Sequence, residues 1–207
     1  MVVTPADHTI FNEHLFIDSI TTAAEGALED KLITIGIKPN RPETGYGYLE
    51  LATGSDANAD IPQPLARFVE KPDTVSANKL LAAGNYLWNA GIFLFTAKTI
   101  LAAFNTHAPD MVTAVQGALD AAKSDLGFTR LDAGAWAKAD KISVDFAVME
   151  KADNLSVVPF NGRWSDLGDW AAVWRETEEN GVSLSGPATA IDCTDTLLRS
   201  EMDGQAV

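Results

Sequence analysis

The sequence predicts an α/β fold, because short β-branched or aromatic runs alternate along it with segments whose apolar residues recur at helical spacing. The run at residues 32–37, closed by Pro39, is typical of a buried strand. The segment 11–28 before it places apolar side chains three or four residues apart, as in a helix that packs on a sheet. With 207 residues and 46% apolar content, the chain is long enough to bury a substantial core.

The later elements follow in the same alternating order. A polar, turn-rich stretch at 52–64 separates two predicted strands, and residues 74–83 are expected to form a short helix. Pro109 divides the segment 96–123 into two helices, because proline cannot continue a helix from within. The remaining predicted strands are 46–51, 65–70, 86–95 and 155–159, and the remaining predicted helices are 145–151 and 169–178.

After Gly181 the pattern changes to short strand-like pieces at 188–192 and 196–200. We therefore expect residues 1–181 to form one domain, and residues 182–207 to form a β-rich tail or the start of a further module.

The chain is strongly acidic, with 15 Lys and Arg residues against 29 Asp and Glu residues and a formal net charge of −14. Such a charge repels a phosphate backbone, so we expect no nucleic-acid partner. The single Cys193 cannot form an internal disulfide, and no apolar run approaches the roughly 20 residues that cross a bilayer. We expect no membrane association and a cytoplasmic location.

Two polar motifs interrupt the strand-like runs and point to a site for a sugar phosphate. In the first, Gly45 and Gly47 would let the backbone approach a ligand closely, while either Tyr46 or Tyr48 could line a pocket and the other belong to the core. The second is the Glu70-Lys71-Pro72 string that follows a predicted strand.

Several polar residues next to these strands have both a binding and a structural interpretation. Asn89, in a Trp-Asn-Ala-Gly motif that ends at Gly91, offers a donor and an acceptor to a sugar hydroxyl, or is a satisfied structural amide. Asp145 either orients a sugar contact or caps the helix at 145–151. Lys71 could direct its ammonium to a phosphate and Glu70 could accept hydrogen bonds from hydroxyls, or the two could form a surface ion pair.

In their order, these motifs resemble the nucleotidyltransferase domain of bacterial mannose-1-phosphate guanylyltransferases, also called GDP-mannose pyrophosphorylases. The likeness extends to about residue 180. The matching segments are residues 5–10, 42–48, 68–72, 86–93, 142–151 and 164–168.

The resemblance implies a Rossmann-like, mixed and mostly parallel sheet of the nucleotide-diphospho-sugar transferase type. It also implies transfer of a guanylyl group from GTP to mannose 1-phosphate, giving GDP-mannose and pyrophosphate. Mg²⁺ would be held by Asp7 and Asp166, which with Lys71 are the expected catalytic residues. The alternative for the two aspartates is that Asp7 caps a turn and Asp166 a helix.

Members of that family open with a glycine-rich, arginine-bearing loop for the triphosphate, and residues 1–8 contain no such loop. We therefore expect an N-terminally shortened copy that lacks the first strands, turns over slowly and self-associates as a homo-oligomer. Three alternatives remain open: a related glucose-1-phosphate nucleotidylyltransferase, a non-catalytic remnant that binds only sugar phosphate, and a purely structural fragment.

Overall fold

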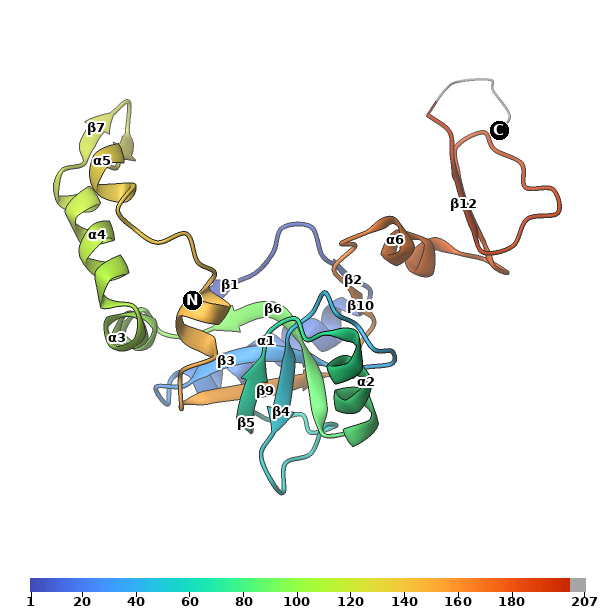
Figure 1. The fold of residues 1–207 in the computed structure, drawn as a ribbon, viewed down its shortest axis with the longest axis horizontal. Helices are drawn as coiled ribbons and strands as arrows, with labels where there is room; N and C mark the ends of the chain where they lie inside the picture. Colours follow the sequence, from blue (N-terminus) through green and yellow to red (C-terminus); the bar gives the residue numbers. More distant parts are fainter. Residues whose placement is uncertain (202–207) are drawn as a thin grey trace. The chain divides into compact units, whose positions relative to one another are not determined.

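The computed structural model describes residues 1–201, which form two compact units (Figure 1). The first unit comprises Met1–Thr4 and Glu13–Asn161, and the second comprises Pro5–Asn12 and the segment that begins at Gly162. The boundary expected near residue 181 falls inside the second unit, and a division of the chain at that point stays a prediction.

One mixed sheet forms the centre of the first unit. Its strand order is β1-β6-β3-β9-β5-β4, and β4 also pairs with β6. The five strands β6, β3, β9, β5 and β4 therefore form a closed ring in which each is paired with two others. The strands are β1 (Val2–Val3), β3 (Leu32–Ile37), β4 (Tyr48–Leu51), β5 (Gln63–Val69), β6 (Tyr86–Leu94) and β9 (Leu155–Phe160).

The prediction of a mostly parallel sheet was wrong. Among the described residues of this sheet, β3 and β9 form the only parallel pair, and the other pairings are antiparallel. β4 and β5 are neighbours joined by the turn-rich stretch that follows Leu51, and so short a connection between paired strands gives an antiparallel pair. Alternation of strands and helices indicates an α/β layer, but it does not fix the direction in which strands pair.

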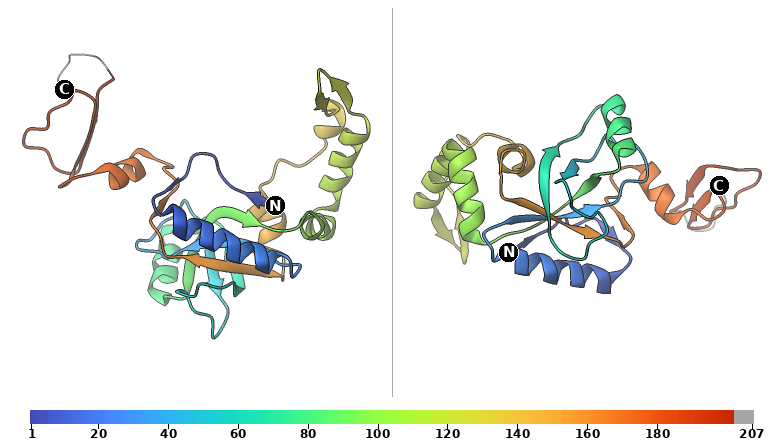
Figure 2. Two further views of the ribbon diagram at one scale, coloured as in Figure 1. Left: turned by 180° about the vertical axis from the view of Figure 1, so that it is seen from behind. Right: turned by 90° about the horizontal axis from the view of Figure 1, so that it is seen from below.

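Helix α1 (Glu13–Ala27) covers one face of the sheet, where it contacts β3 and β9 (Figure 2). The ring of Phe16 packs edge to face on Phe160, with 6.1 Å between the ring centroids. Because β3 and β9 are buried along their whole length, both are mostly apolar on each face, which explains why their sequences show no alternation.

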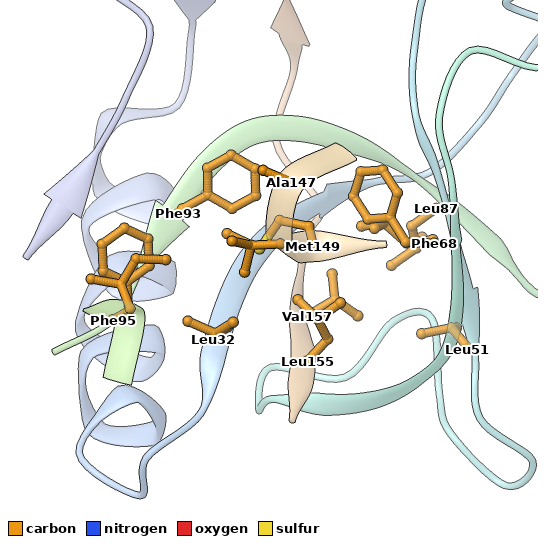
Figure 3. Close-up of a cluster of buried hydrophobic side chains, with 13 residues drawn as sticks. Leu32, Leu51, Phe68, Leu87, Phe93, Phe95, Ala147, Met149, Leu155 and Val157 are labelled. Atoms are coloured by element: carbon orange, nitrogen blue, oxygen red, sulfur yellow. The ribbon is translucent and has the colours of Figure 1, made fainter. Parts of the chain in front are cut away.

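A second apolar layer covers the opposite face (Figure 3). Here α3 (Ala97–His107) and the short π-helix η1 (Asp145–Met149) pack on side chains such as Leu32 and Val157. Within η1, Ala147, Val148 and Met149 are at most 1% exposed. Their burial fixes the position of η1 and therefore of the polar residues at its two ends.

The other elements agree in part with the prediction. Helix α2 lies where it was expected, and Pro109 begins α4, whereas residues 188–192 form no strand and β11 pairs with β12 instead.

No helix among the described residues is long and apolar enough to span a membrane. The first unit also contains α2 (Thr74–Ala83), α4 (Pro109–Asp120), β7 (Lys123–Asp125), β8 (Phe128–Arg130) and α5 (Ala133–Trp136), and the second contains β2 (Thr9–Ile10), β10 (Trp164–Ser165), α6 (Trp170–Thr177), β11 (Val182–Ser185) and β12 (Thr196–Arg199).

Candidate sugar-phosphate and metal sites

The turn between β5 and α2 carries the Glu70-Lys71 pair. Lys71 has a φ of 44°, in the left-handed region that residues other than glycine rarely adopt. Its Nζ lies 3.4 Å from Glu70 Oε1, and its side chain is 61% exposed whereas that of Glu70 is 8% exposed. The turn therefore holds a nearly buried carboxylate in place and leaves the ammonium accessible to a ligand.

Gly47 lies directly against this carboxylate. A β-carbon at Gly47 would stand 2.6 Å from Glu70 Oε2, closer than real β-carbons come to other atoms, and 3.1 Å from the Phe68 ring, which is tighter than most real contacts. Gly45 is less constrained, since its β-carbon would meet only Glu43 Oε1, at 3.5 Å. The absence of a side chain at Gly47 thus makes room for Glu70 itself.

Asn89 connects three segments through its amide. Its Oδ1 accepts hydrogen bonds from Thr34 Oγ1 at 2.8 Å and from the backbone N–H of Gly91 at 3.1 Å. Its Nδ2 donates to Asp145 Oδ1 at 3.2 Å, and its backbone N–H donates to the carbonyl of Gly47 at 2.8 Å. The orientation of the amide is therefore fixed, with its NH₂ group directed toward Asp145.

Burial raises the pKa of Glu70 above its ordinary value, and the nearby charge of Asp145 raises it further, while Lys71 opposes both effects. Burial likewise raises the pKa of Asp145, against the hydrogen bond from its own backbone N–H and the charge of Lys71. Glu150 belongs to the same group, because its Oε1 accepts from the backbone N–H of Glu70 at 3.2 Å. Carboxylates held this close together favour a ligand that supplies hydroxyl donors.

Tyr46 lies in a neighbouring aromatic cluster of the first unit. Its ring packs edge to face on Trp88 with 5.2 Å between centroids, and the Arg41 guanidinium stands 4.8 Å from the centre of the Trp88 ring. Tyr48 is fully buried, and its hydroxyl accepts from the backbone N–H of Glu43 at 2.9 Å. Tyr48 therefore belongs to the core, and a contact between Tyr46 and substrate stays a prediction.

The two aspartates expected to hold a metal ion both lie in the second unit, close to His8. β2 and β10 pair with Ser165 opposite Thr9, so the antiparallel register brings His8 alongside Asp166. Burial lowers the pKa of His8, and the charges of Asp166 and then Asp7 oppose that shift, which places both carboxylates near the imidazole.

Further contacts fix this group of the second unit. The Trp164 indole Nε1 donates to His8 Nδ1 at 3.3 Å, so the remaining ring nitrogen of His8 carries the proton in the neutral form. A β-carbon at Gly168 would stand 2.6 Å from Asp166 Oδ2, so the carboxylate folds back over the glycine.

The donor chemistry fits Mg²⁺ that also binds phosphate. In the part of the chain that the structure describes, no three His, Cys, Asp or Glu side chains form a ready metal cage. Mg²⁺ is usually bound through one or two carboxylates, with substrate phosphates and water completing the shell. Asp7 and Asp166 are suited to that partial role.

Thr34, Glu150 and His8 join these groups although none was predicted as a site residue. Thr34 could have been noticed as a polar residue inside an apolar strand, and Glu150 lies in the segment 142–151 that carried the family resemblance. What the sequence lacked was the long-range pairing that brings each of them to its neighbours.

Two hollows of the first unit lie away from the predicted residues. One of about 450 Å³ is lined by residues that include Lys98, His107 and Lys151, and another of about 300 Å³ by residues that include Asp18 and Phe160. Neither contains a predicted site residue, so the candidate sites are defined by their polar contacts and not by these hollows.

A family model described as nucleotidyl transferase matches residues 1–181. The chain belongs to the nucleotidyl transferase family. A mannose-1-phosphate guanylyltransferase of Sinorhizobium fredii (strain NBRC 101917 / NGR234) is 41% identical over 100% of this chain and 42% of its own length. The xanthan biosynthesis protein XanB of Xanthomonas campestris pv. campestris (strain B100) is 41% identical over 95% of this chain and 41% of its own. The predicted resemblance is thereby confirmed.

The structural relatives agree with this assignment. A structure from Thermus thermophilus, described as a mannose-1-phosphate geranyltransferase, superposes with a TM-score of 0.83 and 30% identity over 100% of this chain and 59% of that one. This nucleotidyl transferase spans about two fifths of the length of the curated relatives it matches, at 42% and 41%.

Proposed function

We propose that this nucleotidyl transferase acts in GDP-mannose synthesis, where a guanylyl group passes from GTP to mannose 1-phosphate with release of pyrophosphate. The names of its relatives support this reaction. The observation that carries the proposal is the meeting of four separate segments in one contact network: Glu70 against Gly47, Gly47 bonded to Asn89, and Asn89 bonded to Asp145.

In the proposed reaction, an oxygen of the sugar phosphate forms a bond to the α-phosphorus of GTP while the bond from that phosphorus to pyrophosphate breaks. No protein nucleophile is required, so the residues act by positioning and by neutralising charge. Lys71 would contact the sugar phosphate through its exposed ammonium, and Glu70 would accept hydrogen bonds from sugar hydroxyls.

The other predicted binding residues complete the sugar site in this proposal. Asn89 and Asp145 would contact hydroxyls, and Gly45, Tyr46 and Gly91 would line the same side of the ligand. Asp7 and Asp166 would hold Mg²⁺, which when bound supplies positive charge to the phosphates.

Calorimetric titration of the chain with mannose 1-phosphate and with GDP-mannose tests the proposal. We expect Glu70→Gln to weaken binding by roughly tenfold, because a hydrogen bond accepted by a carboxylate stabilises by about 1.5–3 kcal/mol and one accepted by a neutral amide by about 0.5–1.5 kcal/mol, and each factor of ten is 1.4 kcal/mol. Glu25→Gln, at an exposed position on α1, is the matched control. Equal affinity of the wild type and Glu70→Gln would refute the sugar-binding role.

The same titration separates the alternatives. Glucose 1-phosphate binding more tightly than mannose 1-phosphate would favour a glucose-1-phosphate nucleotidylyltransferase. Binding of sugar phosphate without binding of GTP would favour the non-catalytic remnant. Pyrophosphate release from GTP and mannose 1-phosphate in the presence of Mg²⁺ reports the complete reaction.

A further inference from the structure

Glu150 follows η1 directly, and its side chain reaches the turn after β5 that carries Glu70. Its Oε1 accepts a hydrogen bond from the backbone N–H of Glu70 at 3.2 Å. At the other end of η1, Asp145 Oδ1 accepts from Asn89 Nδ2, also at 3.2 Å. One short helical turn therefore holds two residues of the candidate sugar site, Glu70 in the turn after β5 and Asn89 in β6.

The π-helical form of η1 explains how it makes both contacts. The backbone N–H of Glu150 donates to the carbonyl of Asp145 at 2.9 Å, a bond that spans five residues where an α-helix spans four. The extra residue in the turn brings Asp145 and Glu150 back to the same side of the helix. Between them, Ala147 and Met149 are buried in the apolar layer, so the turn is fixed to the core (Figure 3).

The peptide that Glu150 holds is next to a strained residue. Lys71 has a φ of 44° and precedes Pro72, which restricts it further. Such a conformation persists only where the surroundings fix it. The hydrogen bond from Glu70 to Glu150 is one such restraint, because it holds the backbone immediately before the left-handed residue.

We propose that Glu150 is a positioning residue for sugar-phosphate binding, which fixes the Glu70-Lys71 turn through the backbone N–H of Glu70. Its carboxylate acts on the protein backbone and does not touch the ligand. The inference rests on the proposed function, because it concerns the same site. The proposal assigns a role to Glu150, which the sequence motifs did not, and it relates the π-helical form of η1 to ligand binding.

A pair of substitutions tests this role. Glu150→Gln keeps an acceptor oxygen at the same reach, whereas Glu150→Ala removes it. In calorimetric titrations of the 207-residue chain with mannose 1-phosphate, we expect Glu150→Ala to raise Kd between about twofold and tenfold, the effect of one ordinary hydrogen bond. Glu150→Gln should recover most of the affinity. Glu25→Ala is the control for loss of an exposed carboxylate.

The outcomes separate this inference from the function on which it rests. Wild-type affinity in Glu150→Ala, or equal losses in Glu150→Ala and Glu150→Gln, would overturn the positioning role while Glu70→Gln still reports the site. Absence of binding in the wild type itself would overturn the proposed function, and the inference with it. Circular dichroism of each variant confirms that a loss of affinity is not a loss of fold.

Discussion

Gly47 shows at the level of one residue how the site limits what the sequence can contain. Replacement by alanine would place a β-carbon 2.6 Å from Glu70 Oε2 and 3.1 Å from the Phe68 ring. We expect Gly47→Ala to lower the free energy of unfolding by about 1 to 3 kcal/mol, as overpacking does, and to weaken mannose 1-phosphate binding because Glu70 must move. Urea unfolding and calorimetric titration measure the two effects.

Gly45 supplies the control two residues away in the same motif. Its β-carbon would make only an ordinary 3.5 Å contact with Glu43 Oε1, so Gly45→Ala should lower the free energy of unfolding less than Gly47→Ala does. If both variants lose the same stability, the cause is the flexibility of the motif and not the space occupied by Glu70.

The carboxyl of Glu70 should also make stability depend on pH. Burial and the charge of Asp145 raise its pKa in the folded protein above the ordinary 4.5. As pH rises from about 4 through that raised pKa, the unfolded chain releases the proton before the folded chain does, so the free energy of unfolding falls. Burial raises the pKa of Asp145 as well, and it contributes in the same direction.

Urea unfolding at a series of pH values measures this dependence. In Glu70→Gln the fall in stability with rising pH should be smaller than in the wild type, because one of the two groups no longer titrates. Glu25→Gln should keep the wild-type slope. A slope in Glu70→Gln equal to that of the wild type would show that the pKa of Glu70 is the same in the folded and unfolded chains.

At the scale of elements, several local signals were read correctly from the sequence, whereas the direction of strand pairing was not. Helix α2 was predicted with its observed bounds, Thr74–Ala83. In the structure Asp73 caps its start and Gly84 ends it with a φ of 76°, and both signals lie next to the helix in the sequence. The direction of strand pairing was predicted wrongly, since no local signal distinguishes a parallel from an antiparallel neighbour. The β7–β8 hairpin, which has three residues in each strand, was not predicted.

The candidate site shows the same division. Glu70, Asn89 and Asp145 were chosen from motifs, and the structure brings them together in the first unit. Thr34 and Glu150 were missed because their contacts, Thr34 with Asn89 and Glu150 with Glu70, join residues 55 and 80 positions apart. Neighbouring residues in the sequence do not indicate that Thr34 and Glu150 make these contacts, because each partner lies far away along the chain.

At the scale of the whole molecule, the predicted residues divide between the two compact units. Glu70 and its neighbours belong to the first, and Asp7 and Asp166 to the second. Each group is organised by contacts within its own unit, so each should bind its own ligand when the other ligand is absent. We therefore expect that the two proposed binding functions can be removed separately.

We expect Asp166→Asn to weaken the binding of Mn²⁺, used as a paramagnetic probe in place of Mg²⁺ because both prefer oxygen ligands, and to leave mannose 1-phosphate affinity in EDTA unchanged. Glu70→Gln should do the reverse. Water proton relaxation measures the first affinity and calorimetry the second. Since a chain of net charge −14 attracts cations nonspecifically, both are measured at about 0.15 M salt with Glu25→Gln as control. Loss of sugar-phosphate affinity in Asp166→Asn equal to that in Glu70→Gln would contradict the separation, because it would make the metal carboxylates part of the sugar site.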